Sequence, residues 1–246
     1  MSEKRDHGGG LDAAVAQYGG TRQQWVDLST GINPMPYAHG PIPPDAWTAL
    51  PDRDAATALE NAARSFWNVP SDAAILAAPG ASSLIAQIPR LTGTSDASDY
   101  VDISGPTYNE HAAAFAAQGW HVHNPNAGPM TPSSPAMAQV AVHPNNPDGR
   151  LWQTRELTAP LRIIDESFCD IVPDQSLIDC AVRPGTLILK SFGKFWGLAG
   201  LRLGFAIGDP TLIERLREML GPWPVSGPAL SIGTQALQDY EWADQT

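Results

Sequence analysis

Residues 189–204 read LKSFGKFWGLAGLRLG, and this segment holds two of the three lysines of the chain, Lys190 and Lys194. Lys194 follows a hydrophobic run and lies among Phe and Trp. Burial among apolar side chains disfavours the ammonium form, and the neutral amine attacks carbonyl groups more readily. Ser191 and Arg202 flank Lys194 and offer a hydroxyl and a guanidinium, the donors that bind a phosphate. The segment therefore predicts a Schiff-base lysine beside a phosphate site.

Upstream of this segment, short hydrophobic runs alternate with helical patterns. Such alternation is typical of an α/β protein whose mostly parallel sheet is covered by helices. Residues 1–50 are rich in Gly, Pro and polar residues and predict an irregular arm. Ligands of such sheets bind at the carboxyl ends of the strands. We predict strands at 74–78, 100–103, 140–142, 161–165, 187–191 and 205–207, and helices at 55–67, 82–91, 108–118 and 211–220.

Several predicted strands end in residues that could bind a ligand. Asp165 ends a hydrophobic strand, and a buried carboxylate is costly unless it is paired, for example with a protonated pyridine nitrogen. A turn-capping role explains Asp165 equally well. Asn146 lies in an Asn-Pro-Asp-Gly turn, for which a structural role is the default. Gly80, Ala81 and Ser82 begin a helix whose N–H groups could bind phosphate, although a simple N-cap serine fits too.

Two aromatic side chains begin the helix predicted at 108–118. Tyr108 and His111 are three residues apart, so they share one face of the first helical turn. Either ring could stack on a planar cofactor. The alternative is a core tyrosine with a solvated histidine, and the spacing does not choose between the two rings.

The composition limits the class of protein. The 246 residues include 26 acidic and 15 basic ones, a formal net charge of −11 that disfavours nucleic-acid binding. A hydrophobic content of 43% indicates a globular chain, with one large domain or one and a half. The only two cysteines exclude a disulfide scaffold. Because no signal peptide or membrane-length apolar run is visible, we expect a cytoplasmic protein without a membrane partner. No metal site and no nucleotide-binding glycine motif is indicated.

In this order, the motifs resemble those of the fold-type-I pyridoxal-phosphate enzymes, the class I and II aminotransferase family. The resemblance extends from about residue 7 to residue 226. It rests on the Ser191–Lys194–Arg202 spacing with its Gly-Leu-Arg-Leu-Gly run, on the Asn146–Gly149 turn and on Asp165-Glu166. The N-terminal His-Gly-Gly at 7–9 and the Asp-Leu-Ser-Thr-Gly-Ile-Asn-Pro at 27–34 look like the threonine-phosphate decarboxylase branch. Histidinol-phosphate aminotransferases are close relatives of that branch.

The resemblance implies a role for each candidate residue. Lys194 would attach pyridoxal 5'-phosphate covalently, Asp165 would pair with the pyridinium nitrogen, and Asn146 would bind the ring oxygen. Tyr108 or His111 would stack on the ring. The phosphate would be bound by Gly80, Ala81, Ser82, Ser191 and Arg202, and the substrate would contact His7, Gly31 and Asn33.

The sequence also departs from the family pattern. Leu50 and Phe168 stand where many relatives have Tyr, and Gly193 stands where many have a hydroxyl residue. We expect an arm at 1–45, a large cofactor-binding domain at 46–225, and at 226–246 the start of the helix leading to a C-terminal small domain that is apparently missing. In the family that domain supplies the arginine for the substrate carboxylate. Its absence would leave an apolar patch exposed at Ala229, Leu230, Ile232 and Leu237.

The implied function is the decarboxylation of L-threonine O-3-phosphate to (R)-1-amino-2-propanol O-2-phosphate in cobalamin biosynthesis, by a homodimer. One alternative is an aminotransferase such as one acting on histidinol phosphate. Another is an inactive cofactor-binding protein, because the shortened chain is expected to bind the cofactor without turning over substrate. Decarboxylation requires the Cα–carboxylate bond to stand perpendicular to the cofactor ring, and the motifs alone do not determine that orientation.

Overall fold

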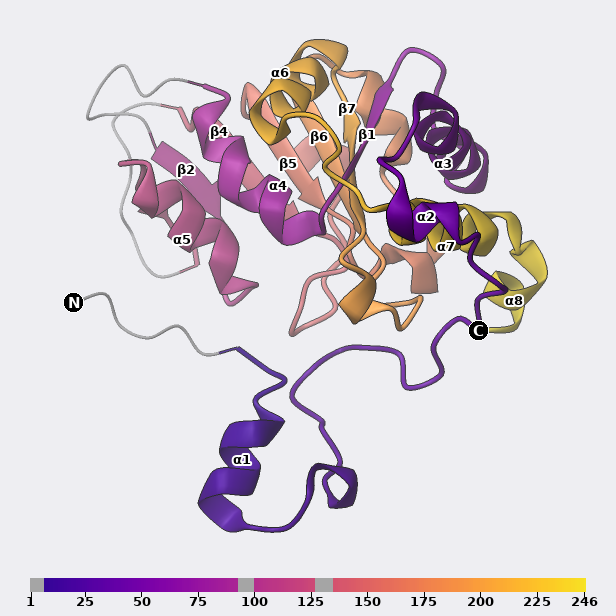
Figure 1. The fold of residues 1–246 in the computed structure, drawn as a ribbon. Helices are drawn as coiled ribbons and strands as arrows, with labels where there is room; N and C mark the ends of the chain where they lie inside the picture. The colour runs from indigo at the N-terminus through magenta and orange to yellow at the C-terminus, as the bar shows by residue number, and fades with distance from the viewer. Residues whose placement is uncertain (1–6, 93–99, 127–134) are drawn as a thin grey trace.

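The computed structural model describes residues 7–92, 100–126 and 135–246. Its centre is a seven-stranded sheet with the strand order β1-β7-β6-β5-β4-β2-β3 (Figure 1). The pairs from β3 through β2, β4 and β5 to β6 are parallel, whereas β7 is antiparallel to both β6 and β1. The sheet is therefore mostly parallel, as predicted. The strands are β1 (Ala74–Ala78), β2 (Tyr100–Ile103), β3 (His121–His123), β4 (Ala138–Val142), β5 (Leu161–Asp165), β6 (Thr186–Ser191) and β7 (Gly204–Gly208).

Helices cover both faces of this sheet (Figure 1). One face packs against α4, α5 and α6, and the other packs against α3 and α7. The apolar faces of these five helices pack into one of two hydrophobic clusters, so the core consists of two layers separated by the sheet. The helices are α1 (Leu11–Tyr18), α2 (Asp45–Thr48), α3 (Arg53–Phe66), α4 (Ala81–Gln87), α5 (Asn109–Ala117), α6 (Pro210–Leu220), α7 (Gly227–Gln238) and α8 (Tyr240–Gln245).

The alternation of side chains along the strands distributes residues between the two layers. In β5, Ile163 belongs to the cluster under α4, α5 and α6, and Ile164 belongs to the cluster under α3 and α7. In β6, Leu189 and Ile188 divide in the same way. Strands buried on both faces read as continuous hydrophobic runs, which is why the sequence identifies them so well.

All six predicted strands and all four predicted helices are confirmed, with boundaries that differ by a few residues. The strand β3 was not predicted, because it has only three residues and its side chains at His121 and Val122 are exposed. The helix α1 was not predicted either, and it buries no residue. Within the described residues, no helix is long and apolar enough to cross a membrane.

The arm is anchored to the body through the segment that carries Lys194. Asn33 N donates to the Lys194 carbonyl at 3.0 Å, and Tyr37 N donates to the Trp196 carbonyl at 2.9 Å. The ring of Tyr37 packs edge-on against Trp196. Because these contacts lie beside the predicted Schiff-base lysine, they bring the preceding residues of the arm over the carboxyl edge of the sheet.

The expected apolar patch on the last helices is wrong. Ala229, Leu230, Ile232 and Leu237 are all buried. Their helix, α7, packs against α3, and Gly233 permits the close approach because an added Cβ would lie only 2.9 Å from a methyl group of Leu59. The apolar face of α7 is therefore part of the core of the large domain.

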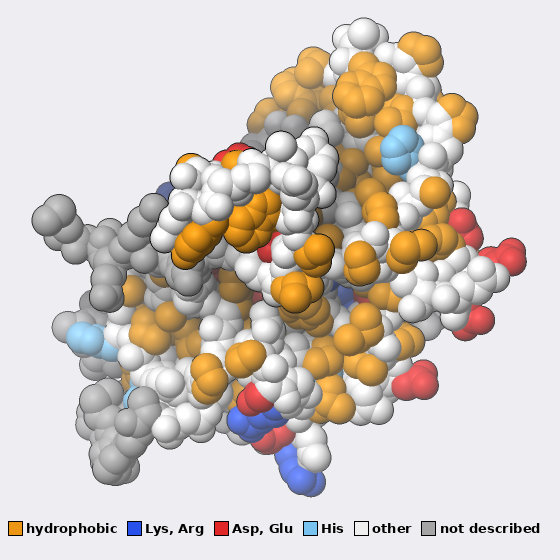
Figure 2. All heavy atoms as spheres, turned by 90° about the horizontal axis from the view of Figure 1, so that it is seen from below, with side chains coloured by type: hydrophobic (Ala, Val, Ile, Leu, Met, Phe, Trp, Pro, Cys, Tyr) orange, Lys and Arg blue, Asp and Glu red, His pale blue; other side chains and the backbone are white. Residues whose placement is uncertain are grey.

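The exposed hydrophobic surface lies elsewhere. The arm, lowest in Figure 1, is nearest the viewer in Figure 2, where hydrophobic side chains cover much of the visible face. Val26 is 80% exposed and Leu28 is 89% exposed on the arm, and Trp47 and Leu50 are exposed at α2. None of these four side chains belongs to either hydrophobic core cluster of the described residues.

The packing of α7 can be tested with Leu237→Ala. Leu237 is fully buried, so the substitution should lower the free energy of unfolding by about 2–5 kcal/mol through lost burial and a residual cavity. Urea unfolding measures the change. The matched control is Leu28→Ala on the arm, which should change stability by less than about 0.5 kcal/mol. Equal effects of the two substitutions would show that α7 does not pack as described.

Candidate active site

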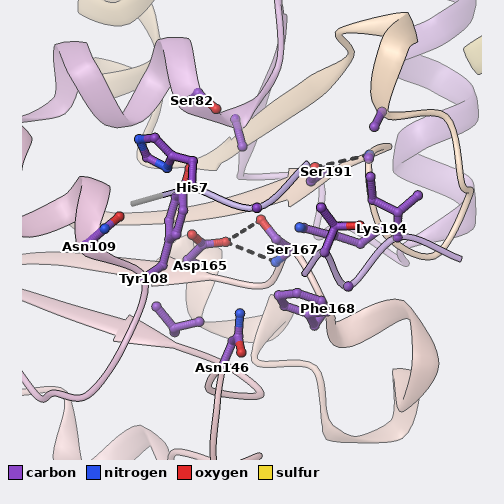
Figure 3. A pocket seen from close by; sticks show the side chains of 18 of the residues that line it. His7, Ser82, Tyr108, Asn109, Asn146, Asp165, Ser167, Phe168, Ser191 and Lys194 are labelled. Atoms are coloured by element: carbon purple, nitrogen blue, oxygen red, sulfur yellow. Dashed lines mark hydrogen bonds between the residues drawn. The ribbon is translucent and has the colours of Figure 1, made fainter. Parts of the chain in front are cut away.

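A cavity of about 560 Å³ opens at the carboxyl edge of the sheet. It is bounded by the residues that follow β1, β2, β4, β5 and β6, and by the arm (Figure 3). β1 contributes to the same edge because it and β6 are both antiparallel to β7 and so run in the same direction. Of the predicted site residues, the structure places these on the wall: His7, Gly31, Ala81, Ser82, Tyr108, Asn146, Asp165, Ser191, Lys194 and Arg202.

Asp165 is the last residue of β5 and is only 3% exposed. Its Oδ2 lies 2.8 Å from His111 Nε2, and its Oδ1 accepts from Ser167 N at 3.0 Å and from Ser167 Oγ at 2.5 Å (Figure 3). Burial by itself would raise the pKa of Asp165, but the hydrogen bonds from His111 and Ser167 hold that pKa below its usual value. The side chain is therefore a buried carboxylate at the cavity wall.

The two lysines of the 189–204 segment have opposite environments. Lys194 lines the cavity, its Nζ lies 5.0 Å from the centre of the Phe168 ring, and burial lowers its pKa, although Asp165 opposes the shift. Lys190 does not line the cavity and is paired with two buried carboxylates. Burial disfavours its charged form, but Asp170 and Glu166 raise its pKa well above the usual range. Only Lys194 of these two has an available amine that faces the cavity.

Arg202 lies at the end of the cavity near the start of α4. Its backbone is left-handed, with φ 52°, which is uncommon for a residue with a side chain. The guanidinium lies over Gly80, where an added Cβ would be 2.4 Å from Nη2. Gly80 itself has φ +84°, a conformation that favours glycine, and its lack of a Cβ leaves room for the guanidinium. Gly80 thus acts by admitting Arg202, and it does not line the cavity.

Tyr108 and His111, which the sequence left as alternatives, take different positions. Tyr108 lines the cavity, and its ring stands beside Asp165 in Figure 3. His111 is 1% exposed, lies outside the cavity wall and contacts the Asp165 carboxylate. Of the two rings, only that of Tyr108 lines the cavity, whereas His111 supports the Asp165 carboxylate.

The arm covers one side of the cavity with residues 7–8 and 29–32. His7 Nε2 lies 3.1 Å from Glu110 Oε1 at the start of α5. Gly31 packs closely against Phe168, since an added Cβ would lie 2.8 Å from that ring. Asn33, a predicted substrate contact, is not on the wall. Its amide donates to the Phe195 carbonyl at 2.9 Å and accepts from Met35 N at 2.9 Å, so its side chain holds the arm in place.

Sequence reasoning missed several wall residues. Ser167 binds Asp165 both through its backbone N–H and through its hydroxyl, and the Asp-x-Ser spacing of a local turn was a signal for this contact. Thr30 and Ile32 line the cavity beside the predicted Gly31. Phe168 was noted only for its lack of a hydroxyl, whereas its ring contacts Lys194. No local pattern predicts these last three positions, because they depend on the path of the arm.

One buried group of potential metal ligands consists of His143, Glu166 and Cys169, whose ligand atoms lie within 4.8 Å of one another. Both ring nitrogens of His143 have partners, since Nδ1 accepts from Trp152 N and Nε2 lies 2.6 Å from the Gln175 carbonyl. Burial, with Glu166 next in effect, raises the pKa of the Cys169 thiol to about 12. Both nitrogens of His143 and both oxygens of Glu166 are thus engaged in contacts within the fold.

This sheet, with a buried carboxylate, a desolvated lysine and an arginine around one cavity, is an arrangement that suits an α/β enzyme of the pyridoxal-phosphate type. The chain belongs to the aminotransferase class I and II family, whose model matches residues 24–245. The family membership supports pyridoxal phosphate as the cofactor.

Two characterised relatives are similar over nearly the whole chain. A threonine-phosphate decarboxylase of a Sinorhizobium species is 40% identical over 97% of this chain and 73% of its own length. A threonine-phosphate decarboxylase of Pseudomonas aeruginosa is 38% identical over 96% of this chain and 72% of its own length.

Solved structures agree on the fold. A histidinol-phosphate aminotransferase of Clostridium acetobutylicum matches with a TM-score of 0.71 and 19% identity, covering 88% of this chain and 71% of that one. Another, from Sinorhizobium meliloti in complex with pyridoxal 5'-phosphate, matches with a TM-score of 0.66 and 20% identity, covering 79% of this chain and 58% of that one. At these identities the likeness shows the shared fold alone.

The support of Asp165 by His111 can be tested with His111→Phe. In the wild type, the lowered pKa means that ionised Asp165 stabilises the fold above its unfolded-state pKa of about 3.9, and this contribution is lost as the pH falls through the folded-state value. Without the imidazole, burial is opposed by the hydrogen bonds of Ser167 and the charge of Lys194 but no longer by His111, so the pKa of Asp165 should rise. The free energy of unfolding at pH 7 should fall by roughly 1–3 kcal/mol.

Carboxyl resonances followed by NMR titration and urea unfolding at pH 7 measure these two effects. The control is His123→Phe, which breaks another histidine–aspartate pair, with 2.6 Å between His123 Nδ1 and Asp102 Oδ1. Asp102 is partly exposed, so water can replace its lost partner and stability should change little. An unchanged pKa of Asp165 in His111→Phe would mean that the imidazole does not maintain the charge.

Proposed function

We propose that this chain is a pyridoxal-phosphate-dependent decarboxylase of L-threonine O-3-phosphate. The observation that carries the proposal is the identity of 40% and 38%, over nearly the whole of this chain, to the two threonine-phosphate decarboxylases. Histidinol-phosphate aminotransferases match over a smaller part of the sequence, for example 36% identity over 39% of this chain. The product would be (R)-1-amino-2-propanol O-2-phosphate, and the step would belong to cobalamin biosynthesis.

The charges around the cavity fit pyridoxal phosphate. Arg202 and Lys194 face the cavity, and no carboxylate among the described residues forms a salt bridge with either. These cations suit a phosphate dianion, and bidentate binding is a property of the guanidinium. The Asp165 carboxylate suits a protonated ring nitrogen. Tyr108 offers an aromatic surface between the two ends.

In this proposal, Arg202, Ser191 and Ser82 hold the phosphate, Asp165 holds the ring nitrogen in its protonated form, and Tyr108 covers one face of the ring. When bound, the cofactor supplies an electron sink that stabilises the negative charge left on Cα after carbon dioxide departs. Lys194 provides the amine that attaches the cofactor. When Lys194 Nζ is not attached to the cofactor, it would be able to hold a proton at the cavity wall.

The choice of bond depends on how the substrate is oriented. The bond between Cα and the carboxylate must stand perpendicular to the ring plane for loss of carbon dioxide, whereas transamination requires the Cα–H bond in that orientation. We assign this orientation to the arm residues at the cavity, above all His7, Thr30 and Gly31, because they form the wall that does not belong to the sheet. His7 is also a suitable donor for the substrate phosphate.

We infer in addition that the protein acts as a homodimer. The support is the exposed hydrophobic surface of Val26, Leu28, Trp47 and Leu50, which the described chain does not cover. Light scattering at micromolar concentration would distinguish a dimer from a monomer.

Cofactor attachment should occur at Lys194. Borohydride reduction of the protein with pyridoxal phosphate, followed by peptide mapping, should find the label on Lys194, because its amine is desolvated and faces the cavity. Lys190 should remain unlabelled, since its ammonium is bound to Glu166 and Asp170. The control is Lys194→Ala, which should lose the label. Labelling of Lys190 instead would place the cofactor site elsewhere.

Product analysis distinguishes the candidate functions. With L-threonine O-3-phosphate, we expect carbon dioxide and an amino-alcohol phosphate in equal amounts. Even a slow reaction answers the question, because the identity of the products shows which bond was broken. The Pseudomonas relative serves as the positive control. A keto product from histidinol phosphate would favour the aminotransferase. Cofactor binding with neither product would favour a non-catalytic cofactor-binding protein.

A further inference from the structure

A buried charged cluster that the proposed reaction does not use lies behind the active site. We call Lys190, Glu166 and Asp170 the ion cluster. Lys190 Nζ lies 2.8 Å from Glu166 Oε2 and 3.4 Å from Asp170 Oδ1, and all three side chains are at most 4% exposed. Every carboxylate has a further donor. Ser176 Oγ and Leu177 N donate to Glu166, and Trp67 Nε1 donates to Asp170 at 2.9 Å.

The ion cluster is one residue away from the site residues on each of two neighbouring strands. Glu166 follows Asp165, and Lys190 precedes Ser191. Because successive side chains of a strand point to opposite faces, the ion cluster lies on the face of the sheet opposite His111 and joins the ends of β5 and β6 from behind. Trp67, which contacts the cluster, belongs to the core layer under α3 and α7.

The ion cluster lies where the backbone hydrogen bonding between β5 and β6 ends. The paired register of β5 and β6 ends at Asp165 opposite Leu189, and one further bond runs from Glu166 N to the Leu189 carbonyl. Beyond that point, no backbone hydrogen bond among the described residues joins the two chain segments directly, and the ion cluster joins them through side chains. A buried ion pair contributes little stability compared with apolar residues of similar volume, but its directional bonds can specify one arrangement.

We propose that Lys190, Glu166 and Asp170 are positioning residues that hold the Asp165 carboxylate and the Ser191–Lys194 turn at the spacing the cofactor requires. This inference rests on the proposed pyridoxal-phosphate site. It assigns the ion cluster to cofactor affinity and to the electronic state of the bound cofactor, and only secondarily to stability.

The test compares three forms of the full chain with the wild type. Lys190→Met/Glu166→Gln/Asp170→Asn removes the charges and keeps the side-chain volumes. Glu166→Gln alone keeps an oxygen acceptor for Leu177 N, but it places an amide nitrogen where Ser176 and Lys190 contact the second carboxylate oxygen, so it removes the short ion pair. The control, Arg162→Met, removes another buried cation, which joins β5 to β6 at their other end through Thr186. Each protein is titrated with pyridoxal phosphate, followed by absorbance across pH, and unfolded thermally without cofactor.

We expect the triple variant to keep a melting temperature within a few degrees of the wild type but to bind pyridoxal phosphate at least about tenfold more weakly, with a shifted absorbance titration. Glu166→Gln should weaken binding several-fold, and it decides the question if the triple variant does not fold. Arg162→Met should lower the melting temperature and leave the affinity of the folded protein unchanged. Wild-type affinity and absorbance in Glu166→Gln and in any folded triple variant would overturn the inference. Failure of the wild type itself to bind the cofactor would instead overturn the proposed function.

Discussion

The ionised state of Asp165 is the constraint on which the rest of the site depends. A carboxylate at the end of a fully buried strand would take up a proton if burial acted alone, and a neutral acid would not hold a protonated ring nitrogen. His111 and Ser167 reverse the balance by donating to both oxygens. His111 therefore supports the charge of Asp165 even though its ring does not line the cavity. The start of α5 thus contributes Tyr108 to the cavity wall and His111 to the support of Asp165.

The period of two along β5 and β6 allows one pair of strand ends to serve two purposes. Asp165 and Ser191 face the cavity, while their neighbours Glu166 and Lys190 face the opposite core layer. A one-residue shift of β5 would place Glu166 in the cavity, and the same shift of β6 would place Lys190 there. The same alternation separates the two lysines chemically. Lys190 is held as an ammonium by its carboxylates and is therefore a poor nucleophile. Lys194 has no carboxylate partner within the described part of the chain and lies beside the ring of Phe168.

Much of the fold was predictable because strands buried on both faces read as hydrophobic runs, and their last residues mark the site. Asp165, Ser191 and, three residues beyond β6, Lys194 follow from that rule, whereas Arg202 was predicted from its spacing to Lys194. The roles of Tyr108 and His111 were not predictable, since residues three apart share a helix face and only packing against β5 tells them apart. Asn33 and α7 show a second limit. An amide that binds backbone looks like one that binds ligand, and an apolar helix face does not reveal which neighbour covers it.

The site also divides into parts that are held with unequal firmness. Asp165, Ser191 and Lys194 belong to strand ends or to the turn after β6, which two core layers and the ion cluster fix. The substrate-facing wall of residues 7–8 and 29–32 belongs to an arm whose helix α1 buries no residue. Its firm attachments are the backbone bonds of Asn33 and Tyr37 to the Lys194 segment. Under the proposed function, the sheet holds the residues for the cofactor, and the choice between loss of carbon dioxide and loss of a proton is assigned to an arm that contributes little to the core. This division explains why a shared fold with the aminotransferases does not by itself determine the reaction.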